Sequence, residues 1–363
     1  MPRGSLKDGR AVHRSGTSGQ MCEHARSGPG AVYLATFSIV GMDPEAREWG
    51  VAVASRVLDV GYIVPWLKAE VGGVASQALS NPHLGPWALE ILADGTPAND
   101  ALKAVLARDS SPDDRQVGIV DKEGNAAAHT GKATLDWAGH RTAQCVSVQG
   151  NILVGPAVVE SMLEQFQGSN GPLGTRLLSA LEAGEKAGGD KRGKQSAALC
   201  VVRRRGGYQG VDDRLIDLKV VDNRDPITEL RRLHEKWQFA FLVPAYSRLA
   251  DEEGDKSGVF LGRVHGLLVG ALESDVDDPE VLNSLAWELA LRKEYPEETL
   301  AAARRAHDLA PDDPQIMDTL AEAFFAAGKV GEAAHWEREA LKRMPGSEFM
   351  KKQLARFELR GKE

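Results

Sequence analysis

The sequence predicts an α+β protein: a layered N-terminal domain of two antiparallel sheets placed face to face with helices outside, followed by an all-α region. Two observations lead to this prediction. From Thr36 to about Val221, short β-rich runs and pairs of helical stretches alternate in blocks, in the order β, α, β, α, β. After Asp225-Pro226 the strand-like runs stop and helical patterns take over. Block alternation favours stacked layers, because each sheet face and each helical stripe must bury its apolar side.

The β-rich runs are short and separated by Gly, Asn or Asp turns, which is typical of antiparallel strands. The segment from Asp121 to Asn125 predicts a hairpin connection between two of them. The strands are expected at 36–41, 49–55, 71–78, 116–121, 125–130, 145–149, 197–203 and 216–221.

The helical stretches come in two pairs, and a proline lies at or near the start of each one. Proline is tolerated in the first turn of a helix because the N–H that it lacks would have no partner there. The helices are expected at 84–94, 97–107, 156–167 and 172–186.

The C-terminal part contains a repeat. The run Asp277-Asp278-Pro279-Glu280-Val281 recurs 35 positions later as Asp312-Asp313-Pro314-Gln315-Ile316. Small residues such as Ala286 and Ala321 and large ones such as Trp287 and Phe324 suit close stacking of helices. A period near this length resembles the tetratricopeptide repeat. Because only two repeats are legible and stable stacks need about three units, neighbouring helices are expected at 227–250, 257–273 and 347–358.

These patterns divide the chain into four parts. Residues 1–35 are Gly-, Ser- and Arg-rich, which predicts either a disordered leader or a mis-called start codon. The layered domain is expected over 36–237, connecting helices over 238–274, and the repeats with their capping helix over 275–358. The segment 251–258 is a solvated turn or a flexible linker.

Composition excludes several classes of protein. The net charge of −8 gives no electrostatic reason to bind nucleic acid or an anionic membrane. No apolar run approaches the roughly 20 residues of a membrane helix. The three cysteines, Cys22, Cys145 and Cys200, fit neither a disulfide framework nor paired zinc ligands. We expect free thiols, no metal and no cofactor.

Thr36 is the first candidate for chemistry because its hydroxyl stands at the head of the first strand. A threonine that becomes a chain terminus carries its own general base, since an α-amine with a pKa of roughly 7.7 to 8.0 is partly neutral near pH 7. In this chain 35 residues precede it, so the leader would have to be removed or initiation would have to occur closer to Thr36.

Two Gly-rich segments supply further candidates. Residues 188–196 place three glycines around Asp190 and Arg192 and then Gln195 and Ser196 at a strand entrance. This segment is either a loop that aims donors at a substrate or a turn braced by an Asp190 to Arg192 salt bridge. Gly150 and Asn151 end another strand, and such residues form oxyanion holes as well as ordinary β-turns.

Other polar residues near strand ends are candidates for substrate binding, although each is also common in structural positions. They are Ser55, Arg56, Gln77, Asn81 and His129. His129 and His140 flank Trp137, but no carboxylate at a telling spacing orients either histidine and nothing resembles a metal cluster.

Taken together these motifs resemble the domain of unknown function 1028 family. The similar segments are Thr-Phe-Ser-Ile-Val at 36–40, Gly-Val-Ala-Val-Ala-Ser-Arg at 50–56, Val-Pro-Trp at 64–66, Gly-Gly-Val-Ala-Ser-Gln-Ala at 72–78, Val-Gln-Gly-Asn at 148–151 and Gly-Gly-Asp at 188–190 with Gln-Ser-Ala at 195–197. The resemblance covers about residues 36–237.

This resemblance implies a fold like that of the N-terminal-nucleophile hydrolases, a four-layer αββα sandwich. In that group a terminal Ser, Thr or Cys attacks an amide carbonyl and its own amine is the base. Carried over, Thr36 is the candidate nucleophile and Gly150 and Asn151 are candidate oxyanion donors. Asp190, Gln195 and Ser196 are candidates to orient the amine or the substrate.

Three hypotheses about function follow. The first is a hydrolase of amide bonds in a small molecule or peptide, with Thr36 as nucleophile once exposed. The second is a non-catalytic binding or scaffolding protein that uses the repeats to hold a protein partner. The third is a cyclohydrolase-like enzyme of the same fold without a terminal nucleophile. We expect a homo-oligomer in the cytoplasm, or a secreted or periplasmic protein if the true N-terminus differs.

Overall fold

The fold was analysed in a computed structural model that describes residues 33–34, 36–254, 258–274 and 277–361. The leader predicted over residues 1–35 lies outside these residues except for Tyr33–Leu34, which form strand β1. Cys22 also lies outside them. Cys145 and Cys200 are free thiols.

Two antiparallel sheets form the N-terminal part. The six-stranded sheet has the order β11-β10-β3-β2-β9-β8, and the five-stranded sheet has the order β1-β5-β6-β7 with β4 paired to β5. The remaining strands are β2 (Thr36–Asp43), β3 (Glu48–Ser55), β4 (Pro65–Lys68), β5 (Gly72–Leu79), β6 (Arg115–Asp121), β7 (Ala126–Thr130), β8 (Gly139–Ala143), β9 (Val146–Asn151), β10 (Ser196–Val202) and β11 (Arg214–Val220).

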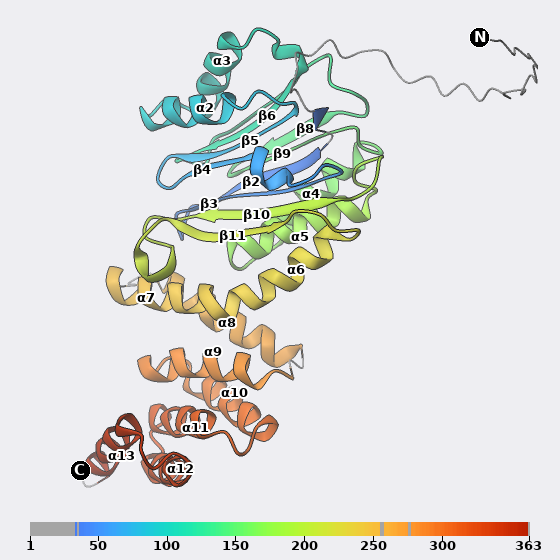
Figure 1. Cartoon of the computed structure of the whole chain (residues 1–363). Helices are drawn as coiled ribbons and strands as arrows, with labels where there is room; N and C mark the ends of the chain where they lie inside the picture. The colour runs from blue at the N-terminus through green and yellow to red at the C-terminus, as the bar shows by residue number, and fades with distance from the viewer. Residues whose placement is uncertain (1–32, 35, 255–257, 275–276, 362–363) are drawn as a thin grey trace, which may run out of the picture. The chain divides into compact units, whose positions relative to one another are not determined.

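Helices cover both outer faces, so the domain is the predicted αββα sandwich (Figure 1). The five-stranded sheet packs against α2 (Leu84–Ala93) and α3 (Ala98–Arg108), and the six-stranded sheet packs against α4 (Ala157–Gly168) and α5 (Leu173–Lys186). The inner faces of the sheets meet where β2 contacts β5 and β6 contacts β9. Burial on both faces explains why β2 and β3 are buried along their whole length.

The structure adds short elements that the sequence pattern did not predict. They include β1, β4, β8, the single turn α1 (Val60–Ile63) and the 3₁₀ turns Pro112–Asp114 and Tyr208–Gly210. β8 was missed because Gly139-His140-Arg141-Thr142-Ala143 is a polar edge strand, and an edge strand can expose one side to water. β1 has only two residues, too few to show alternation.

The chain then forms α6 (Pro226–Trp237), a π-helical turn (Gln238–Leu242), α7 (Val243–Glu253) and α8 (Val259–Glu273). The helical stretch expected over 227–250 is present over Pro226–Glu253, but it is not one regular α-helix, because the π-turn and Pro244 divide it. Proline cannot donate the backbone hydrogen bond that a continuous α-helix would need at that position.

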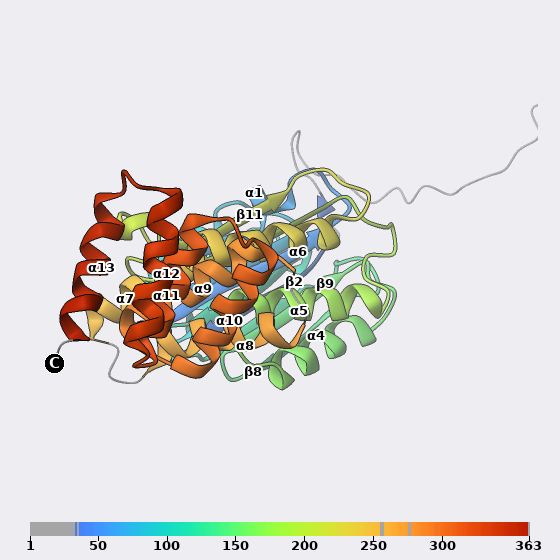
Figure 2. The same ribbon diagram turned by 90° about the horizontal axis from the view of Figure 1, so that it is seen from below.

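The repeat region consists of α9 (Pro279–Arg292), α10 (Pro296–Leu309), α11 (Pro314–Ala326), α12 (Val330–Arg343) and α13 (Glu348–Arg360). Successive helices pack side by side (Figure 2). The repeated Asp-Asp-Pro motif has a structural role at the helix starts. The carboxylates of Asp278 and Asp313 each accept two backbone N–H groups in the first turn, which is the bonding of a helix N-cap.

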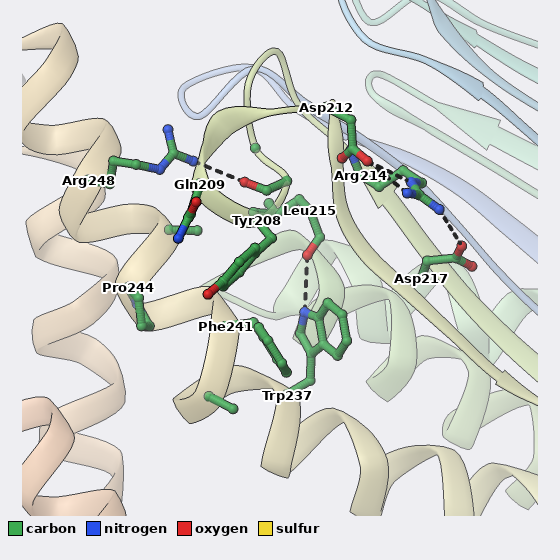
Figure 3. A pocket seen from close by; sticks show the side chains of 14 residues that line it. Tyr208, Gln209, Asp212, Arg214, Leu215, Asp217, Trp237, Phe241, Pro244 and Arg248 are labelled. Carbon is green, nitrogen blue, oxygen red and sulfur yellow. Dashed lines mark hydrogen bonds and ion pairs between the residues drawn. The ribbon is translucent and has the colours of Figure 1, made fainter.

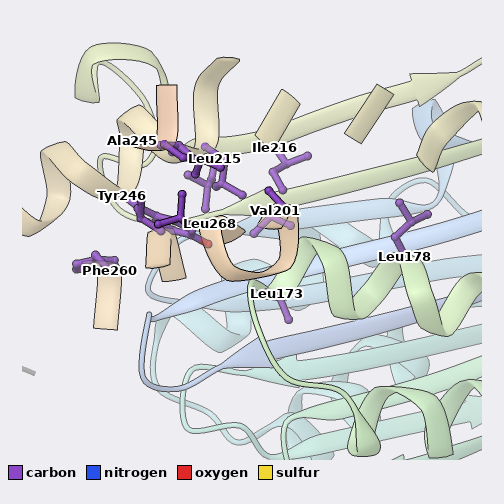
Figure 4. Packing of buried hydrophobic residues seen from close by; sticks show 14 of the residues in the cluster. Leu173, Leu178, Val201, Leu215, Ile216, Ala245, Tyr246, Phe260 and Leu268 are labelled. Carbon is purple, nitrogen blue, oxygen red and sulfur yellow. The ribbon is translucent and has the colours of Figure 1, made fainter. Parts of the chain in front are cut away.

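The six-stranded sheet and α7–α8 share one hydrophobic core. Val201 and Leu215 of the sheet belong to the same cluster as Tyr246, Phe260 and Leu268 of the helices (Figure 4). Polar contacts join the same elements: the Tyr246 hydroxyl donates to Glu48 at 2.9 Å and Arg263 pairs with Asp43 at 2.6 Å. Burial, followed by the charge of Asp43, raises the pKa of Glu48 to about 7.

Candidate functional site

Four polar residues lie in register across one end of the six-stranded sheet. Thr36 pairs with Ser55 of β3 on one side and with Asn151 of β9 on the other. Ser196, the first residue of β10, pairs in turn with Ser55. All four residues are buried. We call Asn151, Thr36, Ser55 and Ser196 the polar row.

The alternation of side chains along each strand places the polar row. Phe37 and Ile39 belong to the core cluster that includes α4 and α5, so Thr36 and Ser38 face the opposite side, toward the second sheet. Ser147, Gln149 and Asn151 alternate in the same way on β9. Successive residues of a strand point to opposite faces, and the polar positions therefore gather between the sheets.

Thr36 is fully buried in this structure. Its hydroxyl lies 3.2 Å from the hydroxyl of Ser55, and its carbonyl accepts a hydrogen bond from Gln77 Nε2 at 3.2 Å. Just upstream, Tyr33–Leu34 pair with Leu79 and Ala78 of the five-stranded sheet. The chain therefore passes from one sheet to the other immediately before Thr36.

A set of amides and hydroxyls fills the space beside the polar row. We call Ser38, Gln77, Gln116, Ser147, Gln149 and Asn151 the glutamine network. The Ser38 hydroxyl donates to Gln77 Oε1 and accepts from Gln149 Nε2, both at 2.7 Å. Ser147 donates to Gln149 Oε1 at 2.7 Å. The network links both sheets, because Gln77 and Gln116 belong to the five-stranded one.

Gln116 is the centre of the network. Its Oε1 accepts from Gln77 Nε2 at 2.8 Å and from Asn151 Nδ2 at 3.0 Å. Its Nε2 lies within hydrogen-bonding distance of the carbonyls of Gly150 at 2.8 Å and Gly139 at 3.1 Å, and of the Thr130 hydroxyl at 3.0 Å. Asn151 Oδ1 is buried and has no hydrogen-bond partner among the described residues.

The Gly-rich segment predicted to approach a ligand is held together by Asp190. This carboxylate accepts from the backbone N–H groups of Arg192 at 2.9 Å and Arg56 at 3.2 Å, and it pairs with the Arg192 guanidinium at 2.9 Å. The Arg56 guanidinium in turn donates to the carbonyl of Arg192. The braced-turn interpretation therefore describes this segment. Through Arg56, the segment also contacts the start of the loop after β3.

Ser196 and Gln195 also have structural contacts. The Ser196 hydroxyl donates to the Val57 carbonyl at 2.6 Å and accepts from the Val60 N–H at 3.0 Å. The backbone of Gln195 donates to the Ser55 carbonyl at 3.0 Å. Ser196 thus lies in the polar row, but its hydroxyl is engaged on the side of α1.

Two predicted substrate-binding residues face away from the row. Asn81 donates to Asp109 at 2.7 Å, and Asp109 also pairs with Arg115. His129 neighbours Thr130 on β7, so the two side chains lie on opposite faces of the strand. Its Nε2 lies 2.9 Å from the carbonyl of Pro112.

The sequence interpretation missed Ser38, Gln116, Gln149 and the link from the network to His140. The Thr130 hydroxyl lies 2.9 Å from His140 Nδ1, so hydrogen bonds continue from Gln116 to this histidine. Burial, with smaller contributions from His129 and Arg141, lowers the pKa of His140. Polar residues at every second position of a buried strand were the available signal.

A separate pocket of about 380 Å³ lies beside the π-turn (Figure 3). Trp237 and Phe241 are 4.4 Å apart between ring centroids, and Tyr208 meets Phe241 edge-on at 6.3 Å. The Trp237 indole N–H donates to the carbonyl of Leu215. Tyr208 is 72% exposed, so this aromatic group is open to solvent on one side. None of the predicted site residues lines it.

A second buried polar set lies among α11, α12 and α13. We call Asp318, Glu322 and Glu337 the carboxylate cluster, and all three are buried. Glu322 pairs with Arg356. Neither Glu337 oxygen receives a hydrogen bond from a donor group among the described residues, and its neighbour is the carboxyl of Asp318. Burial, followed by the neighbouring Asp318 charge, raises the pKa of Glu337, and burial also raises the pKa of Asp318.

Among the described residues, no group of three or more His, Cys, Asp and Glu side chains is arranged to hold a metal ion. None of the helices in those residues has both the length and the apolar character that crossing a membrane requires.

Comparisons with known proteins agree with the two-part architecture. The chain is similar to protein SPO2555 from Silicibacter pomeroyi, a crystal structure of the DUF1028 family, with 34% identity and a TM-score of 0.52 over 56% of this chain and 89% of that one. It is also 31% identical over 107 residues to the TPR repeat-containing protein PA4667 of Pseudomonas aeruginosa, which is 30% of this chain. The chain spans only 17% of the length of that relative.

The family model described as a family of unknown function, DUF1028, matches residues 36–230, which begin at Thr36 and end within α6. The match covers the sandwich and more than half of the chain. This chain therefore belongs to the DUF1028 family and carries a tetratricopeptide-like helical region after the family domain.

Proposed function

We propose that this protein hydrolyses an amide bond in a small molecule or peptide, with Thr36 as the nucleophile after it becomes the N-terminal residue. The observation that carries the proposal is the polar row. It puts the hydroxyl of Thr36 next to that of Ser55 and in register with Asn151, at the end of two central strands. A nucleophile, a neighbouring hydroxyl and an amide are the groups that acyl transfer requires.

Burial of Thr36 is consistent with a precursor. The hydroxyl has no access to a substrate while β1 runs directly ahead of it. Loss of the residues before Thr36 would remove β1 from the five-stranded sheet and would create an α-amine beside the polar row. The unpartnered Asn151 Oδ1 is an acceptor that such an amine could satisfy. A buried acceptor without a partner is costly.

The chemical steps follow from these positions. The neutral amine of Thr36 takes the hydroxyl proton, and Oγ1 attacks the amide carbonyl to give a tetrahedral oxyanion. The remaining N–H of Asn151 Nδ2, from the residue in register with Thr36, donates to that oxyanion. The amine then protonates the leaving nitrogen, and water hydrolyses the threonyl ester with the same amine as base. Gln116 holds Asn151 in place throughout.

The test compares chains that begin at Thr36, produced by cleaving a fusion partner immediately before this residue, with the full chain. Each is incubated with p-nitroanilide substrates and with a β-lactone probe, and intact mass reports acylation. We expect acylation of the chain that begins at Thr36 and a loss of at least ~10³-fold in turnover in Thr36→Ala. Thr142→Ala, an exposed threonine on β8, should retain full activity.

Undiminished turnover in Thr36→Ala would end this mechanism. If that turnover were then lost in Asp190→Ala, the cyclohydrolase-like alternative would take its place. Circular dichroism must show that each variant is folded, because Asp190 braces its loop.

A second candidate function is binding of a protein partner by the helical region. One observation favours it: Trp287 of α9 and Phe349 of α13 lie 6.0 Å apart, and Phe349 is 55% exposed. Exposed aromatic side chains are enriched where proteins bind one another. The full chain would retain its partners in a pull-down, and Trp287→Ala combined with Phe349→Ala should release them. Leu359→Ala, exposed on α13, is the control.

A further inference from the structure

His140 lies where the glutamine network ends, and it lines a pocket of about 620 Å³ together with Thr130, Lys132, Asp136, Trp137 and Arg141. The pocket is formed by the loop between β7 and β8 and by the start of β8. The Thr36 mechanism gives this pocket no role. The hydrogen bonds of the network nevertheless bear on which ring nitrogen of His140 can donate to a ligand.

Backbone carbonyls can only accept hydrogen bonds, so they show which partner donates in each hydrogen bond around Gln116. Gln116 faces the carbonyls of Gly139 and Gly150, so its NH₂ group must lie on that side. Thr130 Oγ1, on the same side, accepts from this NH₂ group. The single proton of the Thr130 hydroxyl is therefore free to be donated elsewhere.

The remaining partner of the Thr130 hydroxyl is His140 Nδ1 at 2.9 Å. In one arrangement the Thr130 hydroxyl donates its remaining proton to Nδ1, so Nδ1 carries no proton and the single N–H of a neutral imidazole is on Nε2. This tautomer gives the Thr130 proton an acceptor. Among the hydrogen bonds of the described residues, the one made by the His140 ring is at Nδ1. The lowered pKa of His140 keeps the ring neutral at pH 7.

The charges around the pocket leave one cation unpaired. Arg141 pairs with Glu160 at 2.6 Å, and Asp136 lies 3.8 Å from Lys191. Lys132 has no ion-pair partner among the described residues. Because His140 is neutral, the pocket carries a net charge of about +1. Trp137 supplies an aromatic wall, so a ligand with an apolar body and one negative group matches it.

We propose that this pocket binds a small monocarboxylate, whose oxygens accept from His140 Nε2–H and Lys132 while its apolar body lies against Trp137. Thr130 is a positioning residue, since it acts only by fixing the histidine tautomer. Binding here needs no terminal threonine and is measured without turnover. It therefore succeeds or fails independently of the Thr36 hydrolase.

The tautomer is tested first, by long-range ¹H–¹⁵N correlation of the histidine rings in the full chain at pH 7.5. We expect His140 to carry its proton on Nε2. Thr130→Val removes the donor to Nδ1 and should give a mixture of tautomers, whereas Thr130→Ser should match the parent. A proton on Nδ1 in the parent protein, or no difference between the Val and Ser variants, would overturn the assignment.

Ligand binding is tested with benzoate, and benzamide serves as the uncharged control of the same shape. We expect chemical-shift changes at residues 130–141 with benzoate and at least tenfold weaker binding of benzamide. His140→Asn keeps an acceptor for Thr130 but lacks the distal N–H, and Lys132→Met lacks the charge. Each should weaken benzoate binding about tenfold or more, because hydrogen bonds to charged groups are the stronger ones.

Two results would contradict the proposal. One is equal binding of benzoate and benzamide, or no binding of benzoate to folded protein. The other is unchanged affinity in His140→Asn while the thermal unfolding of that variant matches the parent. Lys351→Met, on the distant helix α13, should leave benzoate affinity unchanged.

Discussion

The glutamine network and the carboxylate cluster are both buried sets of polar side chains, but they satisfy their hydrogen bonds in different ways. In the network, Gln77 and Gln116 each donate through nitrogen and accept through oxygen. In the cluster, both Glu337 oxygens and Asp318 Oδ1 lack a donor while the carboxyls are ionised, and Glu337 and Asp318 share a hydrogen bond only when one of them holds a proton. An amide is donor and acceptor at once, whereas an ionised carboxylate only accepts.

This difference makes one region insensitive to pH and the other sensitive. The network contains no group that titrates between pH 4 and 10. The free-energy cost of burying the carboxylate cluster falls when Glu337 holds a proton. Burial and the charge of Asp318 therefore raise the pKa of Glu337. The glutamine network is therefore neutral across this range, while the carboxylate cluster of the helical region takes up or releases a proton.

The largest change in the free energy of unfolding is expected from substitution of Gln116, at the centre of the glutamine network. Gln116→Met keeps the shape of the side chain but leaves the carbonyls of Gly139 and Gly150 and the amide of Asn151 without partners. We expect the free energy of unfolding to fall by about 3–5 kcal/mol. Urea denaturation of the full chain measures it.

The matched control is Gln165→Met, an exposed glutamine on α4, which should change stability by less than ~0.5 kcal/mol. The loss in Gln116→Met should be the same at pH 6 and pH 8.5. Equal stabilities of the two variants would mean that the network is not a source of stability.

A smaller change in the free energy of unfolding, of opposite sign, is expected from substitution of Glu337 in the carboxylate cluster. Above the ordinary carboxyl pKa of 4.5, unfolded Glu337 loses its proton while folded Glu337 retains it. The folded state then binds more protons, so the free energy of unfolding falls as pH rises until the raised pKa is passed. Glu337→Gln removes this loss and should stabilise the protein at pH 8.5 by about 1–3 kcal/mol.

Unfolding at pH 5, 7 and 8.5 measures the effect, and Glu348→Gln, exposed on α13, is the control. The gain in Glu337→Gln should grow from pH 5 to pH 8.5. A gain that stays constant across this range would show that the folded and unfolded pKa values of Glu337 are alike.

The smallest effect is expected at the edge of the network. Ser147→Ala removes only the donor to Gln149 Oε1, while Gln149 Nε2 keeps its bond to Ser38. We expect a loss of about 1–2 kcal/mol. Ser161→Ala on α4 is the comparison, because the Ser161 hydroxyl has no hydrogen bond among those of the described residues. Equal losses of stability in the two variants would place Ser147 outside the network.

Much of the fold was predictable from local pattern. The β-rich runs that begin at Thr36 and end at Ser55 marked β2 and β3, and prolines near residues 86 and 172 marked helix starts. The short strand β8 and the break at Gln238–Leu242 were not predictable. An edge strand needs no apolar alternation, and a π-turn depends on how its neighbours pack.

The candidate site was predictable only in part. Thr36, Ser55 and Asn151 were named from strand ends, and the structure brings them into register. Asn81 and His129 share the same sequence signal, yet they contact Asp109 and Pro112 instead. Sequence shows that a polar residue ends a strand, but it does not show which face or which neighbour that residue meets.

By itself the sequence determined the order of the longer strands and helices, the repeat with its Asp-Asp-Pro helix starts, and the family resemblance. These depend on residues close together in the chain, where periodicity and caps act. Tertiary structure alone decided the polar row, the glutamine network and the carboxylate cluster. The polar row and the glutamine network join residues far apart in sequence, such as Thr36 and Asn151, and only the pairing of distant strands brings them together. The carboxylate cluster joins residues of two successive helices, and it forms because α11 and α12 pack against each other.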